Sequence, residues 1–184
     1  MESLPADVVT AETIRSVLGH FPTGVIVVTA HTVSGPVGMT LQSFISLSLD
    51  PPLVLLSVAK TSTSWPRIAE SDQFVVNVLS EGQSELARQF ARSGADKFEG
   101  VDCEHDPRLG GPLLAGVSAW VNCQAEAQYD GGDHTIVVAR VLAASVAEPP
   151  SDHGHVAPLV FHRSSFPRLS PDSRPSNSKG TSHQ

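Results

Sequence analysis

Hydroxyl side chains and one lysine are concentrated in a short segment, Ser57-Val58-Ala59-Lys60-Thr61-Ser62-Thr63-Ser64, which holds five hydroxyl groups and one ammonium. Trp65-Pro66 follows at once, and a proline in this position is typical of the first turn of a helix. Hydroxyls, a cation and the free amides of a helix N-terminus together suit a phosphate group. A Ser/Thr cluster before proline is also typical of an ordinary helix cap. The segment alone therefore leaves two interpretations open, a phosphate site and a capping loop.

A second group of small and hydroxyl residues lies upstream, in Gly-Met-Thr-Leu-Gln-Ser-Phe-Ile-Ser-Leu at positions 38–47. Such residues allow the backbone to pass close to a flat polar ligand and to hydrogen-bond with it. The apolar run at 53–56, after Asp50-Pro51-Pro52, has the length and the flanks of a buried strand. We therefore expect a ligand cradle bordered by a strand that ends at the hydroxyl segment.

The elements that must position these groups follow from the hydrophobic periodicity. Residues 11–20 predict an amphipathic helix capped by Thr10, with Ile14, Val17, Leu18 and Phe21 on one face. Strands are predicted at 25–30, 37–41, 53–56, 73–79, 120–129, 134–146 and 159–161, and further helices at 65–71 and after a capping box at 80–83. Within 121–128 the odd positions are apolar and the even positions polar, which predicts one buried and one wet face for the strand.

Short strands joined by turns, with few helices, predict an all-β barrel rather than a doubly wound sheet. The sequence has no glycine-rich strand–turn–helix fingerprint, so a nicotinamide cofactor would have to bind without a Rossmann unit. Residues 101–116 are rich in Pro and Gly and predict a loop.

Composition narrows the classes of function. The chain has 184 residues, a net charge of -7 and 40% hydrophobic residues, which predicts one globular domain at 11–169. An acidic balance without a basic stripe argues against a nucleic-acid partner. The absence of a long apolar run or signal segment predicts no membrane association and a cytoplasmic location. Residues 1–10 are expected to be flexible and 170–184 to form a disordered tail.

Two other groups are expected to carry no chemistry. Cys103 and Cys123 are predicted to be reduced structural thiols. The Asp152-His153-Gly154-His155 cluster is predicted to be a solvated loop rather than a metal site, because it lacks further ligands.

Six motifs, taken in order along the chain, resemble the short-chain flavin reductases, the reductase components of two-component flavin-dependent monooxygenases. They are Phe21-Pro22-Thr23-Gly24-Val25, Gly38-Met39-Thr40 with Gln42-Ser43-Phe44, Asp50-Pro51-Pro52-Leu53, Phe74-Val75-Val76-Asn77-Val78-Leu79, Asp96-Lys97-Phe98 and Gly132-Asp133-His134. Each motif is weak alone, but the order covers nearly the whole chain. Gln42 departs from the pattern, because the family often has Asn or a small residue there.

The resemblance implies a mainly β fold, the antiparallel split β-barrel of Greek-key type that binds FMN, with a few peripheral helices and a homodimeric assembly. It implies FMN or FAD as the flavin, NADH or NADPH as co-substrate, and delivery of reduced flavin to a partner monooxygenase. The hydride transfer itself is carried by such cofactors, while the protein supplies orientation and close approach. Two alternatives remain, a non-enzymatic flavin-binding or sensor domain and a flavin-dependent oxidase of a related split-barrel family.

The same resemblance implies roles for individual residues. The flavin edge and ribityl chain are assigned to Thr40, Leu41, Gln42, Ser43, Ser57, Val58 and Ala59, and the phosphate to Lys60, Ser62, Thr63 and Ser64. Phe90, Lys97 and Phe98 are expected to border the flavin, although an aromatic on the apolar stripe of a helix, as Phe90 is, equally suits the core. Gly132, Asp133 and the catalytic candidate His134 are assigned to the nicotinamide side, and the alternative for His134 is a solvent-exposed strand end. Arg163 is expected near the active site or at a surface strand end.

Overall fold

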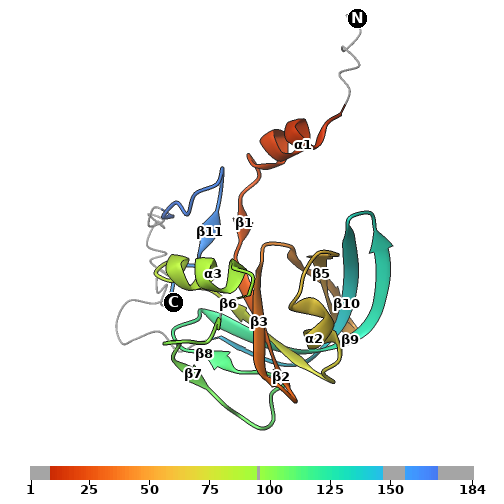
Figure 1. The fold of residues 1–184 in the computed structure, drawn as a ribbon, viewed down its shortest axis with the longest axis vertical. Helices are drawn as coiled ribbons and strands as arrows, with labels where there is room; N and C mark the ends of the chain where they lie inside the picture. The colour runs from red at the N-terminus through yellow and green to blue at the C-terminus, as the bar shows by residue number, and fades with distance from the viewer. Residues whose placement is uncertain (1–8, 95, 147–155, 170–184) are drawn as a thin grey trace, which may run out of the picture.

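A computed structural model describes residues 9–94, 96–146 and 156–169 (Figure 1). Most of the expected flexible N-terminus, the cluster at 152–155 and the expected tail at 170–184 lie outside these residues, so the predictions for them stay predictions. The predicted domain boundaries stay predictions as well.

The body of the protein is a seven-stranded sheet in the order β3-β2-β6-β9-β10-β5-β4, and every pair of neighbours is antiparallel. Its strands are β2 (Ile26–Thr32), β3 (Gly35–Leu41), β4 (Phe44–Leu49), β5 (Pro52–Ala59), β6 (Phe74–Val78), β9 (Ala119–Gly131) and β10 (His134–Val146). The two edge strands, β3 and β4, are joined by only Gln42 and Ser43. Because two residues span a short distance, the two edges of the sheet must come together at this link.

Smaller elements close the ends of the sheet (Figure 1). β1 (Thr23–Gly24) pairs with β11 (Val160–Phe161), and β7 (Cys103–Glu104) pairs with β8 (Leu113–Leu114). The helices are α1 (Ala11–Leu18), α2 (Trp65–Ala69) and α3 (Ser84–Ala91). α3 lies against β3, whereas α1 extends away from the sheet (Figure 1).

Two hydrophobic cores lie on opposite faces of the sheet, and β2 contributes to both. Val28 belongs to the core inside the curved sheet, and its neighbour Val27 belongs to a second core with Phe90 of α3. Successive side chains of a strand point to opposite faces, so a strand covered on both faces must be apolar throughout. This explains the almost continuous β-branched run at 25–30.

A network of buried amides attaches the 101–118 loop to the sheet. The Asn77 side chain donates to the Val27 carbonyl at 3.2 Å and accepts from the Leu114 N–H at 2.9 Å. Asn122 accepts from the Gly110 N–H at 3.0 Å. Since buried amides cost stability unless they are hydrogen-bonded, these contacts hold the loop in place.

The predicted elements are largely confirmed, with four corrections. The predicted loop at 101–116 contains the two paired short strands β7 and β8. The cradle at 38–47 contains a strand, β4, that the hydroxyl-rich pattern concealed. Asn122, expected on the wet face of β9, is buried because the 101–118 loop covers that face. The predicted capping box forms one bond, from the Ser80 N–H to the Gln83 side chain at 2.9 Å, but α3 begins only at Ser84.

Both cysteines are free thiols, as predicted, and burial raises the pKa of the Cys123 thiol to about 12. No helix in the described part of the chain is both long and apolar enough to span a membrane.

Candidate active site

A cleft of about 390 Å³ opens where the two edges of the sheet meet, and we call it the junction cleft. It is lined by Met39, Thr40, Leu41, Gln42, Ser43, Ser57, Ala59, Ala91 and His134. The structure therefore brings together seven residues that sequence reasoning had assigned to the flavin or the nicotinamide. They come from β3, the link to β4, β5 and β10. β5 and β10 are paired in the sheet, whereas β3 is the opposite edge strand and meets them because the sheet curves round to the two-residue link.

Hydrogen bonds fix the walls of the junction cleft. The Ser43 hydroxyl donates to the Ser57 carbonyl at 2.5 Å and accepts from the Ser57 N–H at 3.1 Å. The Thr40 hydroxyl donates to the Ala87 carbonyl of α3 at 2.7 Å. The cleft is therefore pre-formed, which lowers the entropic cost of binding a flat ligand.

His134 begins β10 at the rim of the junction cleft, and its side chain is 41% exposed. Its Nδ1 lies 2.7 Å from Oδ1 of Asp133, and this contact lowers the pKa of the Asp133 carboxyl. The alternative that the sequence left open for His134 was a solvent-exposed strand end, and the structure gives its ring a carboxylate partner. A carboxylate at Nδ1 orients the ring and leaves Nε2 available to a ligand.

We call a second cavity, of about 350 Å³, the cation pocket. It lies beside the junction cleft: Gly38 of β3 lines the cation pocket, and the next residue, Met39, lines the junction cleft. The polar lining residues of the cation pocket are Thr63, Ser64, Arg67, Asp96 and Lys97. The Lys97 ammonium donates to the Gly38 carbonyl and to the Ser64 hydroxyl, both at 3.0 Å.

The residues that line the cation pocket include more cations than anions. Burial, and then the charge of Arg67, lower the pKa of Lys97. None of the ion pairs among the described residues includes Lys97 or Arg67. Asp96 is the one carboxylate among the described lining residues, and its Oδ1 accepts from the Phe98 N–H at 3.1 Å. Two cations and one carboxylate leave the cavity with a net positive charge, which suits an anion such as a phosphate.

Lys60, which was expected at the phosphate, is separated from the other residues of that group. Its ammonium pairs with the Asp130 carboxylate on the β9–β10 hairpin, and Lys60 lines neither the junction cleft nor the cation pocket. The hydroxyl segment turns after β5, so that Thr63 and Ser64 reach the cation pocket while Lys60 remains at the hairpin. The positive charges of the cation pocket come from Arg67, which lies three residues after Ser64, and from Lys97.

Phe90 and Val58 also require correction. Phe90 is fully buried and packs edge-on against Phe98, with ring centroids 5.0 Å apart. Val58 is fully buried in the core inside the sheet, because it alternates with Ser57 and Ala59, which line the junction cleft. Neither side chain can touch a ligand from these positions, so both act as packing residues.

The remaining predicted residues are distributed as follows. Phe98 lines the cation pocket, and Gly132 forms the β9–β10 turn with φ 77°. Arg163 is exposed after β11. The Ser62 hydroxyl accepts from the Trp65 N–H at 3.1 Å. The Ser62 hydroxyl thus binds the first N–H of α2, while the N-cap residue itself is Ser64. Arg163 lines neither site, although its neighbour Ser164 lines a third pocket that shares Thr40 and Gln42 with the junction cleft.

Sequence reasoning missed Arg67 and Arg88. Arg88 lines the pocket that contains Ser164, and its guanidinium lies 5.0 Å from the centre of the Phe166 ring. The helical spacing from Ser64 to Arg67 was available as a signal, because residues three apart share a helix face.

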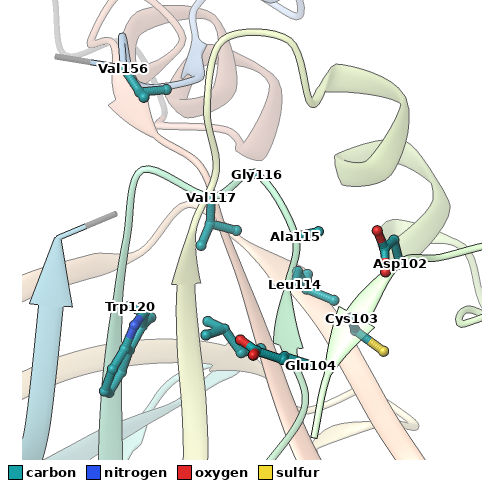
Figure 2. A pocket seen from close by; sticks show the side chains of 10 residues that line it. Asp102, Cys103, Glu104, Leu114, Ala115, Gly116, Val117, Trp120 and Val156 are labelled. Atoms are coloured by element: carbon teal, nitrogen blue, oxygen red, sulfur yellow. The ribbon is translucent and has the colours of Figure 1, made fainter. Parts of the chain in front are cut away.

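The largest cavity described, about 590 Å³, lies apart from this site. Figure 2 shows its lining, which includes Asp102, Glu104 and Trp120. It shares no lining residue with the junction cleft or the cation pocket. Volume alone therefore does not locate the active site, whereas the convergence of polar groups on the junction cleft does.

A family model described as a flavin reductase like domain matches residues 18–170 of this chain. The chain therefore belongs to the flavin reductase family, as its motifs predicted.

Individual relatives agree with this assignment. HsaB of Rhodococcus jostii, the reductase subunit of a flavin-dependent monooxygenase, is 40% identical over 170 residues, or 92% of this chain and 84% of the relative. The FMN reductase (NADH) SmoA of Agrobacterium fabrum is 44% identical over 156 residues, or 85% of this chain and 84% of the relative.

Among solved structures, the NADH:FAD oxidoreductase of Streptomyces globisporus in complex with NAD and FAD fragments matches with a TM-score of 0.81 and 38% identity, covering 91% of this chain and 99% of that one. The predicted split-barrel fold and the enzyme class, an NAD(P)H:flavin oxidoreductase, are confirmed.

Proposed function

We propose that this protein transfers a hydride from NADH to FMN or FAD in the junction cleft and supplies reduced flavin to a partner monooxygenase. The observation that carries the proposal is the position of His134, which lines the junction cleft together with residues 40–43 and Ser57 and has Asp133 at its Nδ1. The cation pocket lies beside this cleft, and its two cations form no ion pair among the described residues. Relatives named as NADH-dependent flavin reductases and as monooxygenase reductase subunits support it.

The residues present fit a flavin. The net positive charge of the cation pocket suits its phosphate, and the junction cleft of about 390 Å³ lies between residues of β3 and β5. A bound flavin supplies the hydride-acceptor chemistry, and NADH supplies the hydride.

The chain contributes binding and orientation. Lys97 and Arg67 hold the phosphate, and Ser43 and Ser57 keep the walls of the junction cleft in place. His134, oriented by Asp133, hydrogen-bonds NADH through Nε2 and so limits its orientations toward the flavin.

An assay of NADH oxidation in air with added flavin tests the proposal. Catalytic loss of NADH absorbance supports a reductase, whereas a flavin-bound protein without turnover supports the binding or sensor alternative. An oxidase would consume an organic substrate without NADH.

His134→Ala tests the role assigned to the imidazole. The flavin Kd should stay within about twofold, while kcat/KM for NADH should fall by about tenfold or more, because a contact to NADH is lost. His20→Ala is the matched control, since His20 is exposed and lines none of the cavities described. Loss of flavin binding in step with activity would place His134 in the flavin site instead.

We infer that the protein is a homodimer, from the apolar surface that α1 leaves uncovered. Leu18 and Phe21 are 63% and 72% exposed, and α1 has no buried residue. A helix of eight residues is marginal in water unless its apolar face is packed. β4 exposes Ile45, Leu47 and Leu49 at the edge of the same sheet, and a second copy could cover both surfaces.

Light scattering on a sizing column tests the dimer, which should have about twice the 19.4 kDa mass of one chain. Leu18→Asp should shift the mass toward the monomer, while Ser16→Asp, an exposed polar position on the same helix, should not. A wild-type monomer would contradict the inference. The cytoplasmic location stays a prediction and fits the need for a pool of NADH.

A further inference from the structure

A polar cavity of about 570 Å³ adjoins the cation pocket, and we call it the hairpin pocket because the β2–β3 turn forms one wall. Arg67 lines both cavities. Its Nη2 donates to the Ser34 hydroxyl on that turn at 3.0 Å. The guanidinium therefore lies at the boundary between the two cavities, where one ligand could contact it from either side.

The charges of the hairpin pocket differ from those of the cation pocket. Arg108 lines the hairpin pocket, but its Nε donates to the Asp106 carboxylate at 2.9 Å, so its charge is already paired. Glu70 and Asp72 add two carboxylates to the lining. Beyond Arg67, the hairpin pocket is therefore suited to an uncharged group that forms hydrogen bonds, and not to a second anion.

Two side chains offer the hairpin pocket a surface for a flat ring. His31 lines it, and its ring centroid lies 5.4 Å from that of His105 at an interplanar angle of 34°. Burial and the charge of His105 lower the pKa of His31, which favours a neutral ring at neutral pH. Val33, at the tip of the turn, also lines the pocket and is 110% exposed.

We propose that the hairpin pocket binds the adenosine half of FAD, with the pyrophosphate held between Lys97 and Arg67, so that FAD is preferred to FMN. The proposal rests on the proposed function, because it extends the same flavin site. The adenine would lie on His31 and Val33, and carboxylates such as Glu70 and Asp72 suit the ribose hydroxyls.

Flavin affinities measured by quenching of flavin fluorescence test the proposal. The wild-type protein should bind FAD at least about fivefold more tightly than FMN, because stacking of the base adds to the affinity. His31→Ala should reduce this ratio to below about twofold. His20→Ala, an exposed histidine outside the hairpin pocket, should leave the ratio unchanged.

AMP provides a second test, because it carries the adenosine without the flavin. AMP should weaken the binding of FAD but leave the binding of riboflavin unchanged. Equal affinities of the wild-type protein for FAD and FMN, an equal loss of both in His31→Ala, or no competition by AMP would overturn the proposal while leaving the reductase function intact. Failure to bind any flavin or to oxidise NADH would instead overturn the proposed function, and this proposal with it.

Discussion

Replacing Lys97 by Met should weaken FMN binding strongly and riboflavin binding hardly at all. The Met side chain keeps the apolar stem that packs in the cation pocket and removes only the ammonium. That ammonium faces the pocket beside Arg67 and has no carboxylate partner among the described residues. Riboflavin lacks the phosphate and therefore loses no contact.

The magnitude follows from the contact that is lost. A hydrogen bond to a charged group contributes about 1.5–3 kcal/mol, and each 1.4 kcal/mol changes the Kd about tenfold. Lys97 is only half-buried, so solvent screening favours the lower end. We expect the FMN Kd to rise about 10- to 30-fold, and the riboflavin Kd to change by less than about threefold.

Lys97→Met also removes the donor to the Gly38 carbonyl and the Ser64 hydroxyl. An unfolding measurement is therefore needed beside the flavin titration, with an expected loss of about 1 kcal/mol. A folded variant that binds riboflavin normally shows that any loss of FMN affinity is local.

Lys60→Met is the matched control, because Lys60 pairs with Asp130 and lines neither cavity. It should leave the FMN Kd within about twofold of the wild-type value. If Lys60→Met weakened FMN binding and Lys97→Met did not, the assignment of the phosphate to the cation pocket would be refuted.

Three further predictions concern pH, packing and the thiols. The pKa of Lys97 is lowered from 10.5, so its ammonium loses its charge at a lower pH than that of free lysine. Flavin titrations at increasing alkaline pH should therefore show that the preference for FMN over riboflavin declines before pH 10.5 is reached. In thermal melts, Gly38→Ala should lower the free energy of unfolding by about 1–3 kcal/mol, because its Cβ would lie 2.6 Å from the buried Phe90 ring. The control Gly82→Ala meets open space and should change the free energy of unfolding by less than about 0.5 kcal/mol. Cys123, with a pKa of about 12, should not react with a thiol reagent at pH 8 until the protein is unfolded, and rapid labelling of the native protein at this position would show that the strand is open.

Local patterns in the sequence determined most of the fold. The β-branched run at 25–30, the alternation along β9 and the glycine turn before His134 each specify a strand or a hairpin from neighbouring residues alone. β4 was not predicted from the sequence, because serines interrupt its apolar residues. Its pairing with β5, rather than its own composition, makes it a strand. The burial of Asn122 likewise depends on a loop that the strand itself does not encode.

The order of the family motifs predicted the family and most of the junction cleft, because Thr40, Gln42, Ser57 and His134 lie within such motifs or beside them. Which lysine faces the cation pocket was decided only by the tertiary structure. Lys60 belongs to the hydroxyl segment in sequence, but it pairs with Asp130 on the β9–β10 hairpin, whereas Lys97 reaches Ser64 from 33 residues away. The side chains of Phe90 and Val58 were likewise placed by packing, since the face that an element buries depends on what covers it. Charge pairing and burial act between elements distant in the chain, so they decided the identity of the site residues that sequence spacing left open.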